Sequence, residues 1–300
     1  MLFQGTYPFP MKPGVVPGSD GAGSVLSVGE HVTRFKTGDS VCTTLNQGHL
    51  AGPLTHQAAQ TSLGGSLDGT FRQYGVFHEN GLVHMPSSLN FREASTLPCA
   101  GVTAWNVLYG LPGKALRPGD TVLTLGSGGV SLFAIQLAVA AGACVISTTS
   151  SAEKAKRLEA LGATHVINYK EDQAWGESAK KLTSGGEGVD FIVEVGGATT
   201  LTQSVRAVKA DGVIAIAGSI GSDIGASGDP GLLSAWASNC IVRGIAVGSR
   251  AQFGELNRAI VINRIKPIVD AKVFKLEQLK EAYHFMSKQQ NFGKVVIDCK

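Results

Sequence analysis

The chain has 300 residues, of which 43% are hydrophobic and 16% are charged, a balance that is typical of a compact globular protein and excludes a disordered chain. Its formal net charge is only +3 and its lysines and arginines are dispersed, which argues against a nucleic-acid groove or a polybasic membrane patch. The five cysteines are scattered without a C-x-x-C pair, so neither a disulfide framework nor a structural zinc site is expected.

The start of the chain carries no targeting signal that we recognise. Residues 1–8 lack a basic region followed by an apolar one, and the longest apolar run, residues 132–146, is interrupted by Gln136 and Gly142. Scattered cysteines fit a reducing compartment. We therefore expect a cytoplasmic protein that does not associate with a membrane.

Residues 1–97 form the first predicted region. Glycine and proline are frequent, and short alternating apolar stretches are separated by turn signals such as Pro17-Gly18, Gly38-Asp39 and Asp68-Gly69. Alternation with period two between tight turns is typical of β-strands. This region is predicted to be a β-rich module.

Residues 121–247 alternate apolar runs with helical patterns, which is the signature of stacked βαβ units. We predict an α/β fold with a doubly wound parallel sheet of the Rossmann type, whose ligand binds at the carboxyl ends of the strands. The predicted strands lie near residues 121–125, 143–148, 164–168, 189–195, 212–218 and 240–247, and the predicted helices near 129–141, 152–161, 175–183, 199–208, 231–238 and 251–263.

The last segment is predicted to hold a strand at 268–270, an amphipathic helix near 276–288 and a closing strand at 294–297. Its apolar ending suggests that it returns to the first module. We therefore expect two domains, with residues 1–97 completed by 265–300 and with 98–264 forming the dinucleotide-binding domain.

The glycine-rich turn after the strand at 121–125 is the most informative motif. It reads Gly126-Ser127-Gly128-Gly129-Val130-Ser131 and opens a long helical pattern. Gly126 permits a sharp turn from strand to helix, and Gly128 lets the backbone approach a pyrophosphate whose charge the helix N-terminus stabilises. Ser131 stands where a third glycine is usual and should slightly loosen the contact between helix and strand. The predicted coenzyme contacts are Gly126, Ser127, Gly128, Gly129 and Val130.

The end of the second strand indicates which dinucleotide binds. A carboxylate about 20 residues past the glycines binds the ribose 2′-hydroxyl of NAD, but hydroxyl-bearing residues 147–151 stand there instead. Hydroxyls and a nearby cation can hold a 2′-phosphate, which favours NADP(H) over NAD(H), with Thr149, Ser150 and Lys154 as contacts. Alternatively, Ser150 or Ser151 only caps the following helix, and the two roles are compatible.

Several motifs together resemble the medium-chain dehydrogenase/reductase superfamily. Residues 17–23, 28–29 and 32–41 resemble its GroES-like module, residues 94–105 its entry into the cofactor domain, and residues 293–296 its closing strand. The resemblance covers essentially the whole chain and is greatest to the zinc-independent branch that includes quinone-oxidoreductase-like, enoyl reductase and alcohol-dehydrogenase-like proteins. In that branch a lysine and a tyrosine grip the 2′-phosphate, which implies roles for Lys154 and Tyr169.

The resemblance also implies that zinc is absent. Zinc-dependent members carry Gly-His-Glu where this chain has Gly18-Ser19-Asp20, and their structural four-cysteine lobe has no counterpart between Cys42 and Phe71. Cys99 stands at the position of another zinc ligand, but one thiolate cannot hold a catalytic zinc, which needs several protein ligands. We expect Cys99 to be an unliganded thiol.

The resemblance has one departure at the start of the chain. Family members normally have further strands before the segment that matches residues 11–23, so the GroES-like domain is expected to be N-terminally incomplete. Missing strands would expose sheet edges. Either the chain is a truncated gene product or its activity is impaired.

The activity implied by the resemblance is hydride transfer from NADPH to a quinone, an enone or a related small-molecule carbonyl compound. Without zinc, hydrogen-bond donors must polarise the carbonyl, and the resemblance places Thr103 near the nicotinamide, although its hydroxyl could equally serve the start of a helix. Further contacts are expected from the strand ends and the closing segment, namely Val195, Gly196, Gly218, Ser219, Phe292 and Lys294.

Two other functions remain open. One is a zinc-free alcohol or aldehyde dehydrogenase, which shares every coenzyme feature. The other is a catalytically impaired NADP-binding protein that senses the coenzyme or binds a partner. The resemblance further implies a homodimer, formed by pairing the edge strand at residues 241–247 across a two-fold axis.

Overall fold

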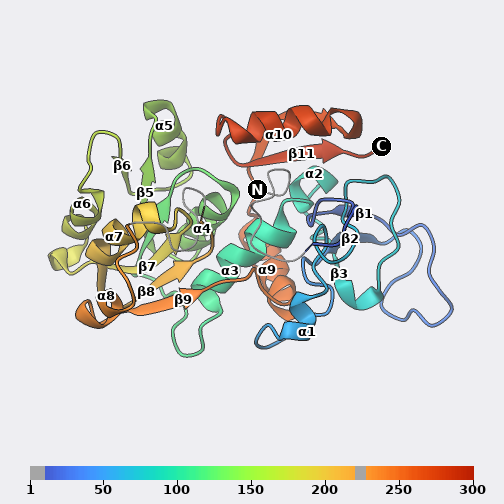
Figure 1. The fold of residues 1–300 in the computed structure, drawn as a ribbon, viewed down its shortest axis with the longest axis horizontal. Helices are drawn as coiled ribbons and strands as arrows, with labels where there is room; N and C mark the ends of the chain where they lie inside the picture. The colour runs from blue at the N-terminus through green and yellow to red at the C-terminus, as the bar shows by residue number, and fades with distance from the viewer. Residues whose placement is uncertain (1–10, 220–227) are drawn as a thin grey trace. The chain divides into compact units, whose positions relative to one another are not determined.

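The computed structural model describes residues 11–219 and 228–300, so the expectations for the first ten residues lie outside its scope. Contacts between Cα atoms divide the chain into two units. One comprises the residues up to Val102 together with Gly248–Lys300, and the other comprises Thr103–Val247. Each is described by itself below and can be followed in Figure 1.

The second unit is built on a six-stranded parallel sheet with the order β6-β5-β4-β7-β8-β9. Its strands are β4 (Thr121–Leu125), β5 (Cys144–Thr149), β6 (His165–Asn168), β7 (Val189–Glu194), β8 (Val208–Ile216) and β9 (Ile241–Gly244). The chain moves outward from β4 to β6 and then returns to continue from β7 to β9. The switch point therefore lies between β4 and β7, where doubly wound sheets bind their ligand. This confirms the predicted fold class.

The helices of this unit lie close to their predicted positions, apart from α3, for which no helix was predicted. They are α3 (Val102–Tyr109, whose first residue belongs to the other unit), α4 (Gly129–Ala140), α5 (Ala152–Ala160), α6 (Trp175–Lys181), α7 (Ala198–Ala207) and α8 (Leu233–Ala237), with a short 3-10 turn at Ser184–Gly186. The largest difference is that β8 begins at Val208 instead of near residue 212. The reason is a bulge: Asp211 has φ of +60° and the register with β7 shifts, so periodicity is broken within one strand.

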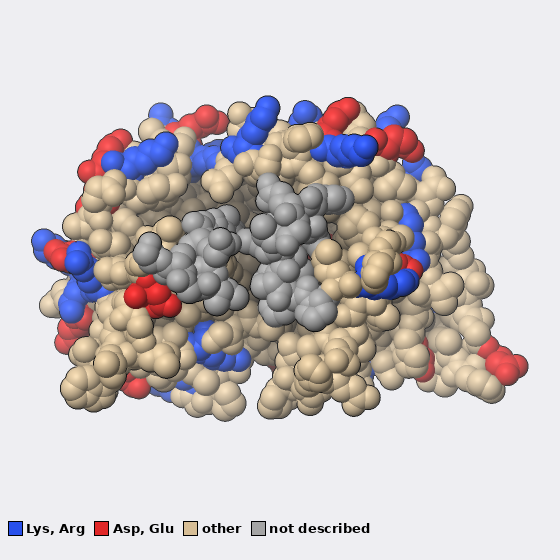
Figure 2. Space-filling model, viewed as in Figure 1, with Lys and Arg blue, Asp and Glu red and all other residues tan. Residues whose placement is uncertain are grey.

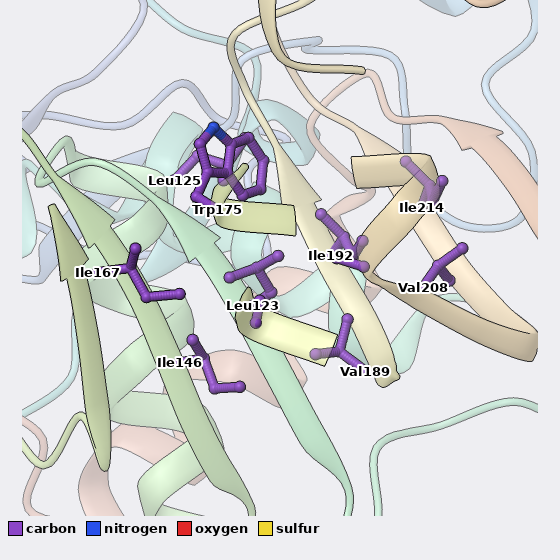
Figure 3. Packing of buried hydrophobic residues seen from close by; sticks show 11 residues of the cluster. Leu123, Leu125, Ile146, Ile167, Trp175, Val189, Ile192, Val208 and Ile214 are labelled. Atoms are coloured by element: carbon purple, nitrogen blue, oxygen red, sulfur yellow. The ribbon is translucent and has the colours of Figure 1, made fainter. Parts of the chain in front are cut away.

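The core of this unit consists of aliphatic side chains from neighbouring strands. Leu123, Ile146, Ile192 and Ile214 are fully buried, and Trp175 of α6 packs into the same cluster (Figure 3). Each such side chain contributes about 1.5–3 kcal/mol when removed from water. The apolar runs that predicted the strands therefore also supply the packing that fixes the sheet.

The first unit is the β-rich module. Its antiparallel sheet holds β1 (Ala22–Ser24), β2 (Ser40–Thr43) and β3 (Leu82–His84), and β10 (Val269–Lys275) pairs in parallel with β11 (Lys294–Asp298). Its helices are α1 (His56–Ala59), α2 (Phe91–Ala94), α9 (Arg250–Asn263) and α10 (Leu279–Ser287), with 3-10 turns at Glu79–Gly81 and Leu276–Gln278 and a π-helix at Leu97–Gly101. The C-terminal segment thus completes this unit.

Helix α9 clusters with the first unit, whereas the sequence analysis placed it in the dinucleotide-binding domain. Its first two amides donate to a loop of the β-rich module, Arg250 N to His49 O at 2.9 Å and Ala251 N to Leu50 O at 3.0 Å. A helical pattern in the sequence predicts the helix but not the loop that accepts hydrogen bonds from its first amides. The helix itself was therefore predicted, and only the unit with which it packs differs.

Charges are mixed on the face shown in Figure 2, where lysine and arginine side chains lie among aspartates and glutamates. Within the described ranges, no helix is both long enough and apolar enough to cross a bilayer. None of the five cysteines, all of which have described positions, is part of a disulfide.

Candidate coenzyme and active site

The glycine turn lies at the carboxyl end of β4. Gly126 has φ of +72°, which glycine adopts without strain, whereas Gly128 has an ordinary φ of −78° and is the N-cap residue of α4. A Cβ atom at Gly126 or Gly128 would meet nothing within 4 Å. At Gly128, therefore, neither packing nor backbone conformation requires glycine. The missing side chain instead leaves the N-terminus of α4 open, as a bound pyrophosphate needs.

Ser131 forms a hydrogen bond across the turn. Its side chain is buried, and its Oγ donates to the carbonyl of Leu125 at 2.7 Å. The expectation that a serine here slightly loosens the contact between helix and strand, relative to a glycine, stays a prediction. The hydroxyl joins the first turn of α4 to the last residue of β4 and holds the phosphate-binding turn in shape.

The carboxyl end of β5 brings two predicted contacts together. Thr149 is opposite Asn168 of β6, and the amide of Tyr169 donates to the carbonyl of Thr149 at 3.0 Å. The side chain of Thr149 is buried, while Ser150 is half-buried and Tyr169 is 39% exposed. The hydroxyl of Ser150 is therefore more accessible to a ligand at this edge than the hydroxyl of Thr149.

Helix α5 begins directly after these residues. Ser151 is its N-cap, because its Oγ accepts from the amide of Lys154 at 3.4 Å. The capping role considered for Ser150 or Ser151 thus falls to Ser151. Lys154 is half-buried in the first turn of this helix. Its binding to a 2′-phosphate stays a prediction.

Glu194 organises the loop after β7 and was missed by the sequence analysis. Its side chain is fully buried. Oε1 accepts from the amides of Gly196 at 2.7 Å and Gly197 at 3.1 Å and from Thr200 Oγ1 at 2.6 Å, and Oε2 accepts from Ser204 Oγ at 2.5 Å. All four donors are uncharged. The carboxylate therefore fixes the loop that carries Val195 and Gly196.

A sequence signal for this arrangement exists. A carboxylate that ends an apolar strand is followed by two glycines, and hydroxyls stand six and ten residues later on one face of the next helix. A buried acid needs several donors. The pattern supplies them locally, which makes a buried and satisfied glutamate plausible from sequence alone.

The loops after β7 and β8 lie side by side. The amide of Ala217 donates to the carbonyl of Glu194 at 2.8 Å, and a Cβ at Gly218 would lie 3.3 Å from the carbonyl oxygen of Val195. At Gly196 a Cβ would lie 2.3 Å from Thr200 Oγ1, so only glycine fits there. Val195, Gly196 and Gly218 are thus brought together at the carboxyl edge of the sheet, and Ser219 follows directly.

Thr103 lies at the start of α3 and is 3% exposed. The position agrees with both of its predicted uses, as a donor to a carbonyl oxygen and as a hydroxyl at the start of a helix. Nothing in its surroundings distinguishes the two, so its catalytic role stays a prediction.

Phe292 and Lys294 belong to the other unit. Phe292 is buried, and its amide donates to Asp270 Oδ2 at 2.9 Å. Lys294 Nζ donates to Asp20 Oδ2 at 2.6 Å, and Asp20 Oδ1 accepts from the amide of Cys99 at 2.7 Å. Burial lowers the pKa of Lys294, but the charges of Asp20 and Cys99 and the hydrogen bond that Lys294 donates to Asp20 outweigh this effect and hold the pKa above its usual range.

The residues near Cys99 do not fit a catalytic zinc. Both oxygens of Asp20 are already bonded, one to an ammonium group that would repel a divalent cation. Ser19 has only a hydroxyl side chain, which is a poor zinc ligand. Among the residues with described positions, no three histidine, cysteine or carboxylate side chains are grouped as a metal site.

A doubly wound sheet with an open glycine turn at its switch point, joined in one chain to a β-rich unit, defines a dinucleotide-dependent oxidoreductase. Comparison with known families agrees. The model described as "Alcohol dehydrogenase GroES-like domain" matches residues 1–87, and the one described as "Zinc-binding dehydrogenase" matches residues 129–261. The chain belongs to the medium-chain dehydrogenase/reductase superfamily and is an oxidoreductase of this type.

Individual relatives cover nearly the whole chain. A zinc-type alcohol dehydrogenase-like protein of Schizosaccharomyces pombe is 45% identical over 301 residues, which cover 99% of this chain and 86% of that protein. The crystal structure of a putative alcohol dehydrogenase from Sinorhizobium meliloti superposes with a TM-score of 0.87 at 40% identity, covering 97% of this chain and 84% of that one. A 2-octenoyl-CoA carboxylase reductase in complex with NADP and 2-octenoyl-CoA has a TM-score of 0.82 at 27% identity, covering 95% and 68%.

Proposed function

We propose that the protein transfers hydride from NADPH to a conjugated carbonyl compound, such as a quinone or an enone, without zinc. The observation that carries this proposal is the open glycine turn beside a β5 end that has no carboxylate. The turn can bind a pyrophosphate, and the end of β5 can bind a phosphorylated ribose.

The preference for NADPH rests on charge. An acid at the end of β5 would repel a 2′-phosphate, whereas Ser150, Lys154 and Tyr169 can donate hydrogen bonds to it. The NADP-bound 2-octenoyl-CoA carboxylase reductase shows that this coenzyme is used by a protein of similar fold. Thr149 contributes to this site by positioning Tyr169, because the carbonyl of Thr149 accepts a hydrogen bond from the amide of Tyr169.

When bound, the coenzyme supplies the hydride. The chain itself orients the two reactants: the loop fixed by Glu194 supports the nicotinamide half, and small residues at Gly196 and Gly218 allow close approach. Thr103 donates a hydrogen bond to the carbonyl oxygen as negative charge develops on it. Lys294, held by Asp20, and Phe292 lie in the other unit and stay predicted coenzyme contacts.

We propose polarisation of the substrate carbonyl without zinc because the side chains near Cys99 do not suit a metal ion. Cys99 is the one thiol at a position that the superfamily uses for zinc, and its neighbours are a bonded aspartate and an ammonium group. A conjugated acceptor suits such a site, because hydride addition to an enone needs less carbonyl activation than reduction of an isolated ketone. The acyl chain of 2-octenoyl-CoA, bound by one relative, is conjugated in the same sense.

A second candidate is oxidoreduction of alcohols and aldehydes. The names of the Schizosaccharomyces pombe and Sinorhizobium meliloti relatives favour it. It uses the same coenzyme contacts and differs in the substrate. A screen of quinones, enones, alcohols and aldehydes with NADPH, NADP+ and added zinc separates the two, because zinc-stimulated alcohol oxidation would contradict the zinc-free proposal.

Titration of the purified protein with NADPH and NADH, followed by nicotinamide fluorescence, tests the coenzyme assignment. We expect tighter binding of NADPH, and we expect Lys154→Ala to weaken it by about tenfold to a hundredfold, as loss of a charged hydrogen bond does. Lys156→Ala is the matched control, because Lys156 is exposed on the same helix. Equal affinities for both coenzymes, unchanged by Lys154→Ala, would overturn the assignment.

The same preparation tests whether the chain is catalytically impaired. Tight NADPH binding without NADPH oxidation by any acceptor in the screen would favour a coenzyme-sensing protein over an enzyme. NADPH oxidation by an enone or quinone, lost in a Thr103→Val variant that still binds NADPH, would support the proposed reaction.

A further inference from the structure

A cavity in the first unit is lined by three arginines. It has a volume of about 490 Å³, and Arg34, Arg250 and Arg258 contribute to its wall together with Glu255 and Asn257. Arg34 comes from the loop between β1 and β2, whereas Arg250 and Arg258 come from α9. None of these residues belongs to the coenzyme site. Three guanidinium groups against one carboxylate give the wall a net positive charge.

Two of the guanidinium groups are held in place by carbonyl and amide oxygens of residues 79–82. Arg34 Nη1 donates to the carbonyls of Glu79 and Leu82, the latter at 3.2 Å. Arg250 Nη1 donates to the carbonyl of Asn80 at 3.3 Å and to its Oδ1 at 2.7 Å. In the described part of the chain these bonds use Nη1 alone, so Nη2 and Nε of each arginine remain for a ligand.

The two like charges are close enough to act on each other. Burial and the positive charge of Arg250 lower the pKa of Arg34, and the carboxylate of Glu79 offsets part of this effect. Glu79 is itself engaged, because its Oε2 accepts from the amides of Thr33 at 3.0 Å and Arg34 at 2.9 Å. Fixed like charges disfavour the fold unless an anion binds between them.

A polar atom in the same wall lacks a partner. Asn257 Nδ2 donates to the carbonyl of His84 at 2.9 Å, and Asn257 Oδ1 is buried and accepts no hydrogen bond from any residue with a described position. A buried acceptor without a donor is unfavourable by about 1–3 kcal/mol. Because this oxygen is closed off from solvent, a ligand hydroxyl can reach it only after the side chain of Asn257 moves.

We infer that this cavity binds a small phosphorylated metabolite whose phosphoryl group lies between Arg34, Arg250 and Arg258. Arginine forks match phosphoryl oxygens in pairs. The volume is in the range of about 300–1,000 Å³ that suits small molecules. A hydroxyl near the phosphate, as in a sugar phosphate, donates to Asn257 Oδ1 after that side chain moves. This inference is independent of the coenzyme and substrate proposed above.

Isothermal titration with glucose 6-phosphate, inorganic phosphate and glucose tests the inference on the full chain. We expect one equivalent of glucose 6-phosphate to bind, inorganic phosphate to bind more weakly, and glucose not to bind. Arg258→Gln should weaken glucose 6-phosphate binding by about tenfold. Arg258 is exposed, so the variant should fold normally. The double variant Arg250→Gln/Arg258→Gln should abolish binding.

Three further variants serve as controls. Arg117→Gln changes an exposed arginine of the other unit and should leave binding unchanged. Lys154→Ala should weaken the binding of NADPH without affecting the binding of glucose 6-phosphate. The double arginine variant should weaken the binding of glucose 6-phosphate only, so that failure of either proposed site is recognised separately. Asn257→Ala should weaken glucose 6-phosphate but not inorganic phosphate. If it affects neither and both ligands bind equally, free phosphate is the ligand and the hydroxyl contact is wrong.

Two results would contradict the proposed phosphate site. One is no saturable binding of either phosphate probe to the wild-type protein. The other is equal affinity in the wild type and in a folded Arg250→Gln/Arg258→Gln variant, since the arginines would then play no part.

Discussion

Glu194 is the residue whose removal should reveal most about the coenzyme site. Its buried carboxylate holds four uncharged donors, two of them amides of the loop that carries Val195. Glu194→Ala leaves these donors unsatisfied, so we expect a loss of roughly 1–3 kcal/mol in the free energy of unfolding. We also expect NADPH binding to weaken by more than tenfold. Thermal melting and fluorescence titration measure the two effects.

Two variants separate this positioning role from general damage. Glu194→Gln keeps an acceptor for Gly196, Gly197 and Thr200 and should restore most of the NADPH affinity. Ser204→Ala removes only the partner of Oε2 and should lower stability more than it lowers affinity. Glu194→Ala protein that binds NADPH as the wild type does would show that the loop needs no such support.

Gly128 tests whether the turn is shaped for a ligand. A Cβ there meets nothing within 4 Å and the backbone conformation is ordinary, so Gly128→Ala should melt like the wild type. Its methyl group would stand where a phosphate approaches, so NADPH affinity should fall at least tenfold. Gly126→Ala should instead be destabilised by about 1 kcal/mol or more, because φ at that position is +72°. Normal NADPH binding by Gly128→Ala would argue against the phosphate position.

Single residues show how far sequence reasoning reaches. The motif identified Gly126 and Gly128 because their role depends on local spacing. The hydrogen bond from Ser131 to Leu125 and the network of Glu194 depend on which atoms meet after folding, so composition and period do not reveal them.

At the scale of elements, hydrophobic period predicted the strands and helices of the sheet well. Long apolar runs such as β4 and β7 are buried on both faces, which makes their signal strong. It missed the true start of β8, because the bulge at Asp211 interrupts the pattern. It predicted α9 itself, but not that α9 packs with the β-rich unit through the amides of Arg250 and Ala251.

The ion pair between α2 and β11 predicts a pH-dependent stability. Arg92 donates to Asp298 through Nε at 3.2 Å and through Nη2 at 2.5 Å, and this hydrogen bond lowers the pKa of Asp298 below its usual range. A carboxyl with a lowered pKa in the folded state contributes stability above its unfolded pKa, about 3.9, and loses it as the pH falls through the folded pKa. Both side chains are partly exposed, so the effect should be small and weakened by salt.

Urea unfolding of the wild type and Arg92→Ala at low salt measures this effect. The difference in unfolding midpoint should be present near pH 7 and shrink below about pH 4. Asp298→Asn should reproduce the Arg92→Ala result at neutral pH. An equal difference at both pH values would mean that Arg92 acts by packing and not by charge.

At the scale of the whole molecule, the sequence predicted the fold class and family because the glycine turn, the alternating pattern and the matching segments agree across both units. It did not reveal the substrate, since acceptor choice depends on side chains around a pocket and not on a motif. It also did not reveal the arginine-lined cavity, because Arg34 is far in sequence from Arg250 and Arg258.

We propose that the protein is a homodimer formed along β9. This strand is the last in the sheet, and the preceding α8 region exposes Leu232, Leu233 and Trp236 at 88%, 79% and 82%. Unpaired strand edges beside exposed apolar side chains favour association. Trp236→Glu should give a monomer by size-exclusion chromatography with light scattering. Ile262→Glu, at a residue 78% exposed in the other unit, should not. A monomeric wild type would contradict the proposal.

A crystal structure of the protein grown with NADPH would test the coenzyme assignment at atomic detail. We expect the pyrophosphate at the amide groups after Gly126 and Gly128, and the 2′-phosphate within hydrogen-bonding distance of Ser150 and Lys154. Density for the coenzyme away from this turn, or a 2′-phosphate that contacts neither side chain, would contradict it.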